Sequence, residues 1–331
     1  MQLRQRTIPN FLDLLMNNEL EQLGYLPRLM LRLTIGAAQL PQDVQDRHAD
    51  YVLRKQRADG GWTGREGDSD VYYTSFALRS LAILGLLEGR VAQRAAEFLK
   101  SRLTTHETIV DLLSLVYSVK LIEGACGLDA LSASRDGWAS RLAELLHTSR
   151  RPDGGFSKSL EGQAGSTYQT FLVLLCLELI EQPCPDADGA AAFLMKQRQG
   201  DGGFLEIRVA KRSGTNPTAA AIGALQVLKQ LSADTATSAA EFLADLQTDE
   251  GGFQANTRIP LPDLLSSFTA CVTLADLNHL DWIVTKRVQS YAESMQQPTG
   301  GFRGFEFDPA DDIEYCFYGL GLLALLAEAG A

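Results

Sequence analysis

The chain has 331 residues, of which 45% are hydrophobic and 21% are charged, and its formal net charge is −11. This acidic balance argues against nucleic-acid binding, which needs a cationic surface. No apolar run is long enough to span a membrane, and residues 1–9 lack the apolar stretch of a signal peptide. The five cysteines are scattered without CxxC spacing, as in a reducing compartment, so we expect a cytoplasmic protein.

In chain order, residues 1–45 are predicted to form a helical extension packed on a single repeat domain of residues 46–331. Within that domain, Gly-Gly followed by an aromatic residue occurs five times. The turns are Gly60-Gly61-Trp62, Gly154-Gly155-Phe156, Gly202-Gly203-Phe204, Gly251-Gly252-Phe253 and Gly300-Gly301-Phe302. They start 94, 48, 49 and 49 residues apart. A fixed period of this size marks a repeat architecture. Because the first gap is nearly double, we expect a sixth unit with Leu103–Glu107 in place of its glycines.

Each turn separates two kinds of predicted helix. Polar-faced segments precede the turns: Val91–Ser101, Ala190–Gln197, Ala239–Gln247 and Val284–Gln296. Almost wholly apolar segments follow: Val71–Leu84, Ile109–Ile122, Tyr168–Ile180, Pro217–Leu228, Leu264–Leu277 and Ile313–Leu326. A helix that is apolar all round must be enclosed, and an open array would need polar end caps. The pattern predicts an all-α fold, a closed α/α toroid of six helix pairs. Its glycines turn the chain and are interpreted as structural.

In such a ring the N-termini of the six inner helices gather at one end. Their unpaired N–H groups and dipoles favour an anion there. Lys211 and Arg212, adjacent cations before an inner helix, are the best candidates for holding a diphosphate, with Arg258 on the next linker. The aromatic candidates for lining an apolar cavity are Tyr72, Tyr168, Phe268 and Tyr315.

Acidic residues gather at two inner-helix starts. Asp263 precedes one helix, and Asp308, Asp311, Asp312 and Glu314 lie close together before the last. One helix needs only one cap, so the cluster indicates either a solvated acidic loop or a site with a raised pKa or a bound cation. Asp263, Asp311 and Asp312 are therefore the candidate catalytic residues. Asp263 and Asp312 are the candidate ligands of a Mg²⁺ ion.

The sequence resembles the prenyltransferase and terpene-cyclase superfamily of α/α toroids, and within it the β subunits of Rab geranylgeranyltransferase and their relatives. The resemblance covers roughly residues 45–328 and rests on the stretches His48–Val52, Gly251–Asp263 and Thr299–Leu326. It implies a transferase that acts on an isoprenoid diphosphate of the farnesyl or geranylgeranyl class. Because the β subunits of this family work with a helical α partner, it also implies such a partner or self-association.

The resemblance implies a zinc ion held by an Asp, a Cys two residues later and a His on the next repeat. Here Asp263 is retained, but Leu265 stands at the Cys position and Tyr315 at the His position. The family's diphosphate-contacting His falls near Ser213 or Gly214 and is also absent. Leucine cannot bind zinc, so we do not expect a zinc-dependent thiol prenyltransferase. Oxygen-only ligands suit Mg²⁺ better.

Three functions stay open at this point. The first is binding of an isoprenoid diphosphate in the central cavity, with transfer or processing of the prenyl group without zinc. The second is a non-catalytic scaffold that binds a prenyl ligand or a protein and has lost the metal site. The third is an enzyme like the class II terpene cyclases, with an Asp acid of raised pKa, although their Asp-x-Asp-Asp motif is not matched.

Overall fold

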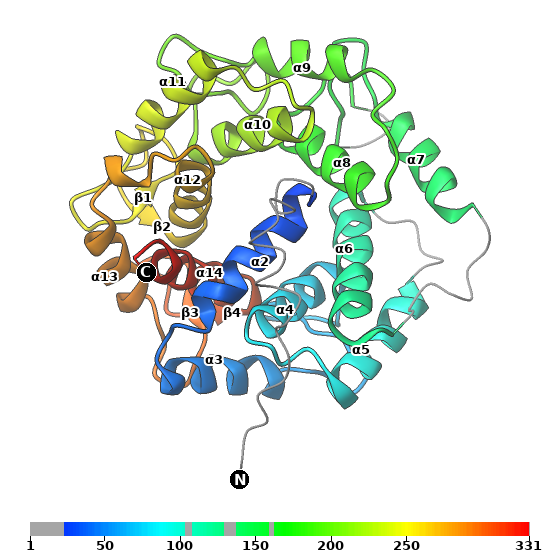
Figure 1. The fold of residues 1–331 in the computed structure, drawn as a ribbon, viewed down its shortest axis with the longest axis vertical. Coiled ribbons are helices and arrows are strands. Elements are labelled where there is room, and N and C mark those ends of the chain that lie inside the picture. The colour runs from blue at the N-terminus through cyan, green and yellow to red at the C-terminus, as the bar shows by residue number, and fades with distance from the viewer. Residues whose placement is uncertain (1–22, 103–107, 129–136, 159–161, 331) are drawn as a thin grey trace.

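A computed structural model describes residues 23–102, 108–128, 137–158 and 162–330. Leu103–Glu107, the expected site of the eroded turn, lie outside these ranges. Outer and inner helices alternate along the described chain and form two concentric layers (Figure 1). The prediction of an all-α toroid is confirmed. In the described ranges, no helix combines the length and hydropathy that a membrane span requires.

Six helix pairs make up the ring. The outer helices are α3 (Gln42–Arg54), α5 (Gly89–Arg102), α7 (Trp138–Thr148), α9 (Ala187–Met195), α11 (Ala233–Ala244) and α13 (Thr285–Ser294). The inner helices are α4 (Val71–Ile83), α6 (Ile109–Cys126), α8 (Thr167–Leu179), α10 (Thr215–Val227), α12 (Leu264–Asp276) and α14 (Ile313–Ala329). Each inner helix packs against the next, and α14 packs against α4, which closes the ring.

Short antiparallel strands tie some turns to the following inner helix. Strands β1 (Phe253–Gln254) and β2 (Pro262–Asp263) pair with Phe253 opposite Asp263. Strands β3 (Phe302–Arg303) and β4 (Asp311–Asp312) pair with Phe302 opposite Asp312. A 3₁₀ turn, η2 (Leu280–Trp282), lies between α12 and α13. These strands hold both ends of a linker together at the start of an inner helix.

The Gly-Gly turns join neighbouring repeats. The first glycine of each turn has a positive φ, and a Cβ there would overlap a backbone carbonyl of the next outer helix. The second glycine faces an aromatic ring of that same helix. The ring residues are Phe98, Phe193, Phe242, Tyr291 and, for the last turn, Tyr51 of α3. The sixth repeat therefore joins the first by the same contact that joins the others.

The eroded repeat has also lost its aromatic partner. Each of the rings on α9, α11, α13 and α3 lies 11 residues before the aromatic residue of its own turn. The same count back from Phe156 reaches Leu145 of α7, which is 49% exposed. The glycines of the second unit and the ring that would cover them are thus both missing.

In four of the five turns the aromatic residue is hydrogen-bonded to the inner helix. Trp62, Phe156, Phe204 and Phe253 are fully buried. Their backbone N–H groups donate to hydroxyls of Thr74, Thr170, Thr218 and Ser267 on the inner helices, at 2.9–3.0 Å. A buried N–H without a partner would cost free energy, so these hydroxyls fix the turn on the helix.

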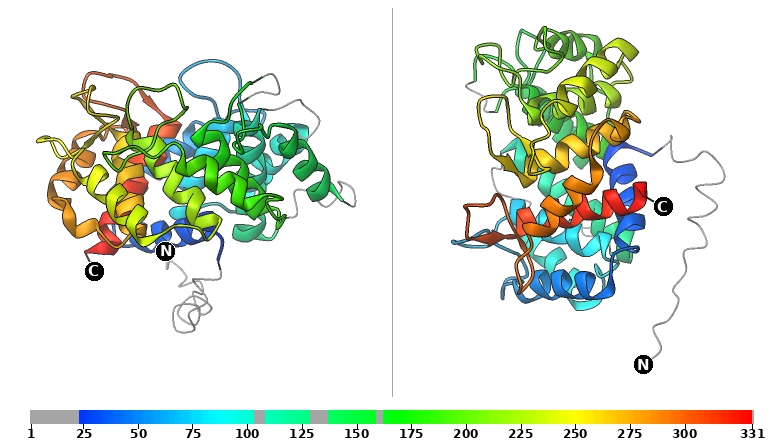
Figure 2. Two further views of the ribbon diagram at one scale, coloured as in Figure 1. Left: turned by 90° about the horizontal axis from the view of Figure 1, so that it is seen from above. Right: turned by 90° about the vertical axis from the view of Figure 1, so that its left-hand side faces the viewer.

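The linkers gather at one end of the ring (Figure 2), and neighbouring linkers are hydrogen-bonded to one another. The Thr167 N–H donates to the Glu206 carbonyl at 2.9 Å, and the Thr215 N–H donates to the Ala255 carbonyl at 2.9 Å. The Leu264 N–H donates to the Gly304 carbonyl at 2.8 Å. We call this end the mouth of the ring.

Helix α2 (Tyr25–Ala37) lies across the other end (Figures 1 and 2). It packs mainly on α14 and α4, and Arg32 pairs with Asp276 at 3.0 Å and with Glu328 at 3.4 Å. The N-terminal extension therefore covers the ring opening in its α2 part. Helix α3 already belongs to the first pair and begins at Gln42, ahead of the domain start predicted at residue 46.

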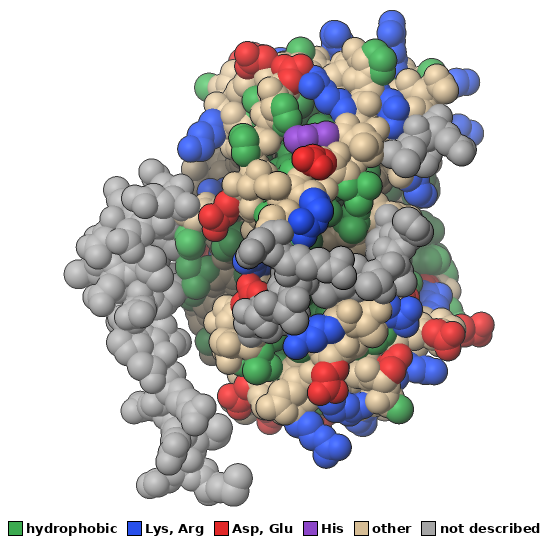
Figure 3. Space-filling model, turned by 90° about the vertical axis from the view of Figure 1, so that its right-hand side faces the viewer, with side chains coloured by type: hydrophobic (Ala, Val, Ile, Leu, Met, Phe, Trp, Pro, Cys, Tyr) green, Lys and Arg blue, Asp and Glu red, His purple; other side chains and the backbone are tan. Residues whose placement is uncertain are grey.

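The outside of the ring is polar. On the side that carries α7, acidic and basic side chains are interspersed and hydrophobic ones are scattered between them (Figure 3). The apolar side chains instead gather between the two helix layers and around the ring centre. The cavity described next is therefore surrounded by the core of the protein.

Candidate functional site

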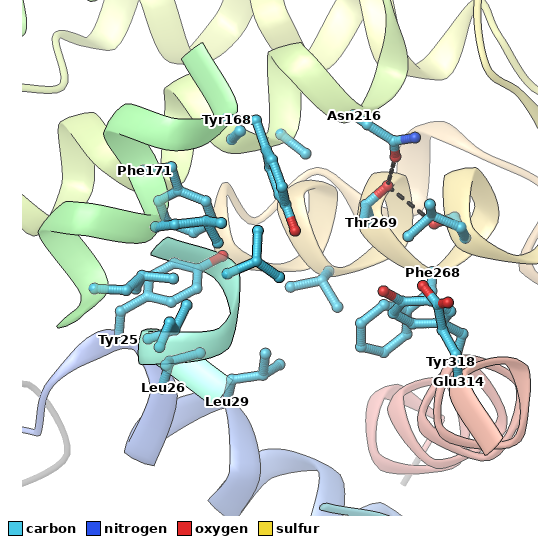
Figure 4. Close-up of a pocket in the computed structure, with 18 of the residues that line it drawn as sticks. Tyr25, Leu26, Leu29, Tyr168, Phe171, Asn216, Phe268, Thr269, Glu314 and Tyr318 are labelled. Carbon is cyan, nitrogen blue, oxygen red and sulfur yellow. Dashed lines mark hydrogen bonds between the residues drawn. The ribbon is translucent and has the colours of Figure 1, made fainter. Parts of the chain in front are cut away.

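A cavity of about 520 Å³ occupies the ring centre. It extends from the first turns of the inner helices at the mouth to α2 at the closed end (Figure 4). Volumes of this size are typical of small-molecule sites. The apolar and aromatic lining includes Leu26, Tyr72, Phe76, Val110, Leu113, Tyr168, Phe171, Leu172, Leu175, Leu265, Phe268, Val272 and Tyr318.

Helix α2 forms the floor of the cavity. Tyr25, Leu26 and Leu29 face the inner helices, and the Tyr25 ring packs edge-on against Phe171 with centroids 5.5 Å apart. The Tyr25 N–H donates to the Glu178 carboxylate at 2.7 Å, which fixes the first turn of α2 on α8. Tyr25 and Leu29 also border a second hollow on the far side of α2. The floor is thus one helix thick.

Aromatic rings from three inner helices form one wall. Phe76 of α4 lies 5.0 Å from Tyr72 and 5.3 Å from Tyr318 of α14, between ring centroids. Phe268 of α12 lies 5.4 Å from Tyr318. Such a wall is suited to flat apolar groups, and ring faces carry the negative end of a quadrupole that attracts cations.

The carboxyl group of Glu314 lies within this wall (Figure 4). The Tyr72 hydroxyl donates to it at 2.7 Å, and Tyr318 is a second hydrogen-bond partner. Burial raises the pKa of Glu314, and the charge of Asp312 raises it further, while the two tyrosines and Arg79 oppose the shift. Glu314 therefore keeps its proton to a higher pH than an exposed glutamate does.

Arg79 is a cation on the otherwise apolar α4 helix. Its guanidinium lies 4.6 Å from the ring centres of both Phe76 and Tyr117 and 5.7 Å from that of Phe317. The Arg79 Nε is buried without a hydrogen-bond partner. This places a positive charge at the cavity wall, close enough to act on Glu314 and Tyr168.

Glu206 is the second acidic residue of the lining. The Ser166 hydroxyl donates to its carboxylate, and the Tyr168 N–H does so at 3.3 Å. The carboxylate of one linker thus covers the N-terminus of the neighbouring helix α8. Burial raises the pKa of Glu206, and these hydrogen bonds counteract the rise.

Five of the six inner helices are capped by their own side chains. Asp70, Thr108, Ser166, Asp263 and Asp312 accept from first-turn N–H groups of α4, α6, α8, α12 and α14. Helix α10 begins after Gly214 and has no side-chain cap. Lys211 and Arg212 are exposed in the linker before it. Because the Thr215 N–H donates to the Ala255 carbonyl and Pro217 has no N–H, the Asn216 N–H is, among the described residues, the first-turn donor of α10 that is left for an external anion.

The structure brings some of the predicted residues into the cavity and leaves others outside. Tyr72, Tyr168 and Phe268 line it. Tyr315 does not: its ring packs against Gly304, and burial raises its pKa to about 12. Arg258, Lys211 and Arg212 are exposed on linkers at the mouth.

The three predicted aspartates also lie outside the lining. Asp263 and Asp312 are the caps of α12 and α14. Asp311 accepts from the Tyr51 hydroxyl at 2.6 Å and from the Lys55 ammonium at 2.8 Å, so it connects the last repeat to α3. Each of the three aspartates therefore has a structural role.

Asp263 and Asp312, the predicted Mg²⁺ ligands, both have partners within the protein. The two oxygens of Asp263 accept from the Ser266 N–H and hydroxyl, both at 2.7 Å, and Asp312 faces Arg65 Nε at 3.5 Å. Within the described ranges, no three His, Cys, Asp or Glu side chains are grouped so that they could bind a metal. Asp263 and Asp312 each cap an inner helix, and a Mg²⁺ ion bound by these two carboxylates stays a prediction.

Sequence reasoning missed Arg79, Glu206 and the floor of α2. One signal was present: Arg79 is the single charged residue of the apolar segment Val71–Leu84. Glu314 belongs to the acidic cluster noted in the sequence but was not among the predicted catalytic residues. It differs from its neighbours because it follows the cap residue Asp312 and so lies in the first turn of α14.

The model of the prenyltransferase alpha-alpha toroid domain family matches residues 28–204 and 218–330. The chain belongs to this family. No curated protein matches it. Among solved structures it is similar to Candida albicans protein geranylgeranyltransferase-I complexed with GGPP, with 15% identity, a TM-score of 0.69, and coverage of 85% of this chain and 91% of the other.

Two further solved structures show how widely this architecture occurs. A variant of the type II terpene cyclase MstE from Scytonema, in complex with geranylgeranyl dihydroxybenzoate, is 16% identical with a TM-score of 0.60, covering 89% of this chain and 98% of the other. A glycosidase variant in complex with glucose is 14% identical with a TM-score of 0.57, covering 91% and 98%. At such identities the likeness shows the fold alone, so function must be argued from the site of this toroid-family protein.

Proposed function

We propose that this toroid-family protein binds an isoprenoid diphosphate, with the hydrocarbon chain in the central cavity. The observation that carries the proposal is the cavity itself: about 520 Å³, lined by aliphatic and aromatic side chains, and bounded by α2 at one end and by the first turns of inner helices at the other. The similar geranylgeranyltransferase-I and terpene cyclase were solved with GGPP and with a geranylgeranyl compound. Burial of such a chain is favourable in proportion to its apolar area.

In this proposal the diphosphate lies at the start of α10. This helix has no side-chain cap, and Asn216 of its first turn lines the cavity. Lys211 and Arg212 precede it, and neither forms an ion pair with a described residue that would have to be broken. The helix dipole and two cations together favour a doubly charged headgroup.

The test compares geranylgeranyl diphosphate with geranylgeraniol in calorimetric binding. Lys211→Gln with Arg212→Gln is expected to weaken diphosphate binding at least about tenfold, since a hydrogen bond to a charged group contributes about 1.5–3 kcal/mol, and to leave alcohol binding unchanged. Arg90→Gln with Lys286→Gln, on outer helices α5 and α13, removes the same charge elsewhere. Equal diphosphate affinities in both double variants would contradict the headgroup position. If the wild type binds neither compound, the proposed function is wrong.

A second candidate function is proton-initiated cyclisation, favoured by the position of Glu314. The predicted aspartate acids lie outside the cavity, whereas the Glu314 carboxyl lies inside it and has a raised pKa. In this reaction Glu314 transfers its proton to one carbon of an isoprenoid double bond, and the other carbon becomes a cation. The next double bond of the chain attacks this cation and closes the ring. A carbon beside the new cation then loses its proton to solvent, and the Glu314 carboxylate is reprotonated from solvent. The faces of Phe76, Phe268 and Tyr318 would stabilise the cation.

Glu314→Gln tests this candidate because glutamine keeps the shape and removes the acid. The variant is expected to bind geranylgeranyl diphosphate normally and to form no cyclic product, as followed by mass spectrometry of extracted products. Turnover by the wild type is expected to fall as the pH rises through the pKa of Glu314, because only the protonated acid reacts. Binding without any turnover in the wild type would instead favour the non-catalytic scaffold.

Three finer predictions from the sequence are kept as proposals. They are the closer relation to Rab geranylgeranyltransferase β subunits, a helical α-subunit-like partner or self-association, and a cytoplasmic location. The toroid family and the closed ring are compatible with each of them.

A further inference from the structure

Two neighbouring linkers expose aliphatic side chains next to arginines. The linker before α10 carries Ile207-Arg208-Val209, and the linker before α12 carries Arg258-Ile259-Pro260-Leu261. Val209 is 81% exposed, Ile259 47%, and Ile207 and Leu261 39% each. Exposed large aliphatic residues gathered in this way usually mark an interaction surface. We call Ile207, Arg208, Val209, Arg258, Ile259 and Leu261 the mouth patch.

The two halves of the mouth patch belong to one surface. The linkers are joined where the Thr215 N–H donates to the Ala255 carbonyl at 2.9 Å and the Thr215 hydroxyl donates to the Gln254 carbonyl at 2.6 Å. Both project from the mouth side of the ring, away from α2 (Figure 2). Glu206, which precedes Ile207, and Leu265, which lies four residues after Leu261, line the cavity. The patch therefore borders the cavity entrance.

The charge of this surface is opposite to that of the protein. The whole chain has a net charge of −11, yet residues 205–214 and 254–263 expose Arg208, Lys211, Arg212 and Arg258. Their two acidic residues are turned inward: Glu206 bonds to Ser166, and Asp263 caps α12. A local cationic surface with aliphatic side chains between the charges is complementary to anionic headgroups above an apolar layer.

We propose that the mouth patch docks the cavity entrance onto an anionic lipid surface. The arginines contact headgroup phosphates, and Val209, Ile207, Ile259 and Leu261 enter the boundary between headgroups and acyl chains. A ligand of the proposed class, whose hydrocarbon chain lies in the bilayer and whose diphosphate lies among the headgroups, then reaches the cavity without exposing its chain to water. This proposal goes beyond ligand binding in the cavity. It gives a function to the exposed aliphatic side chains of the mouth patch, which ligand binding in the cavity does not explain.

A second copy of the chain fits the patch less well. Two mouth patches facing each other would bring like charges together. The acidic linker 303–312 offers the opposite charge, but its Asp308 is already paired with Arg65. The groove beside that linker is lined by Leu261, Phe305 and Phe307, but also by Glu250, Glu306 and residues of α13, so it is not a purely apolar surface for a second copy. Self-association is therefore an alternative outcome of the test below.

The experiment measures co-sedimentation of the full chain with phosphatidylcholine vesicles, with and without phosphatidylserine, in the absence of any isoprenoid. Wild type is expected to bind the phosphatidylserine vesicles and to be released by salt. Arg208→Gln with Arg258→Gln is expected to lower the partition coefficient roughly tenfold or more, given about one kcal/mol for each cation near an anionic surface. Val209→Ser with Ile259→Ser is expected to weaken binding at low salt and to leave its salt dependence unchanged, because this variant keeps both arginines.

The control is Arg90→Gln with Lys286→Gln, which changes the net charge equally. If it lowers vesicle binding as much as the mouth-patch pair does, or if wild type does not bind the vesicles, the proposal is overturned. A concentration-dependent dimer in sedimentation velocity, lost in Val209→Ser with Ile259→Ser, would assign the patch to self-association instead. Circular dichroism checks that each variant is folded. Isoprenoid binding is measured without vesicles, and vesicle binding is measured without isoprenoid. A negative result for membrane docking therefore leaves the proposed isoprenoid binding intact, and the reverse also holds.

Discussion

At the five described joints between repeats, a glycine stands where any other side chain would overlap a main-chain carbonyl. Gly300 shows this at the joint that closes the ring, where its Cβ would meet the Arg47 carbonyl and the Tyr51 side chain. Its φ of 87° is also unfavourable for other residues. Two costs, conformational and steric, therefore fall on the same position.

A matched pair of substitutions separates these two costs. Gly67 has a φ of 96°, similar to that of Gly300, but nothing lies within 4 Å of its Cβ position. Gly67→Ala should lower the free energy of unfolding by about 1 kcal/mol from the backbone alone. Gly300→Ala should cost about 3 kcal/mol or more, because outer helix α3 must also move. Urea unfolding measures the free energy of unfolding of both variants. Equal losses of stability would show that a Cβ atom at residue 300 is accommodated without moving α3.

Residue-level reasoning predicted the structural role of the glycines but not the chemistry of the cavity. The turns are periodic, and a period is visible in one sequence. The position of Glu314 depends on which side of α14 faces the ring centre, and α14 is apolar all round, so its sequence does not define an inward face. Arg79 and Glu206 were missed for a related reason, since their surroundings come from other repeats.

At the level of elements, the helix boundaries followed closely from hydrophobic pattern. The predicted segment Val71–Leu84 is α4 (Val71–Ile83), and Leu264–Leu277 is α12 (Leu264–Asp276). Helix α2 was harder to place. Its sequence is that of an amphipathic helix, and only its contacts with α14, α4 and α8 put it across the ring opening. The pattern predicts that such a helix packs, but not where.

Because α2 forms the floor, it should limit the length of the ligand. Tyr25→Ala removes the ring that packs on Phe171 and opens the cavity toward the hollow beyond α2. We expect the ratio of dissociation constants for geranylgeranyl and geranylfarnesyl diphosphate to shift toward the longer chain by roughly tenfold, the effect of burying about two more CH₂ groups. Tyr25→Phe keeps the ring and should leave the ratio unchanged. An unchanged ratio in Tyr25→Ala would show that the chain does not reach the floor.

At the level of the whole molecule, closure depends on polar contacts between the first and last repeats. His48 of α3 is fully buried, with Nε2 3.0 Å from the Gln296 side-chain oxygen and Nδ1 accepting from the Gly301 N–H at 3.1 Å. The imidazole also stacks on Phe302, with centroids 4.5 Å apart. Since Nδ1 is an acceptor, this arrangement requires the neutral ring. Burial lowers the pKa of His48 to about 4.

The ring should therefore be sensitive to acid at this seam. The unfolded chain takes up the His48 proton near pH 6.5, whereas the folded chain does so only near pH 4. The free energy of unfolding should fall as the pH drops between these values, by about 3 kcal/mol in total. Comparing urea unfolding of wild type and His48→Gln isolates this contribution, because the variant lacks it. His279→Gln should behave like wild type, and a wild-type curve parallel to that of His48→Gln would contradict the assignment.

The same experiment shows whether the ring unfolds as one unit. With Trp138→Phe and Trp282→Phe, the remaining Trp62 reports on the first repeat alone. Its fluorescence transition should coincide with the circular dichroism transition at each pH, since every repeat has two neighbours. Separate transitions would indicate that the repeats unfold in sequence, as in an open array.

The joints between repeats have a geometric consequence for evolution of this scaffold. Since the last pair meets the first through the same glycine contact as at the other four described joints, the circumference is a whole number of pairs. Adding or removing a pair would change the size of the ring centre in one large step. Large changes in ligand size would then require a change in pair number, whereas exchanges on α2 or the inner helices adjust the cavity in smaller increments.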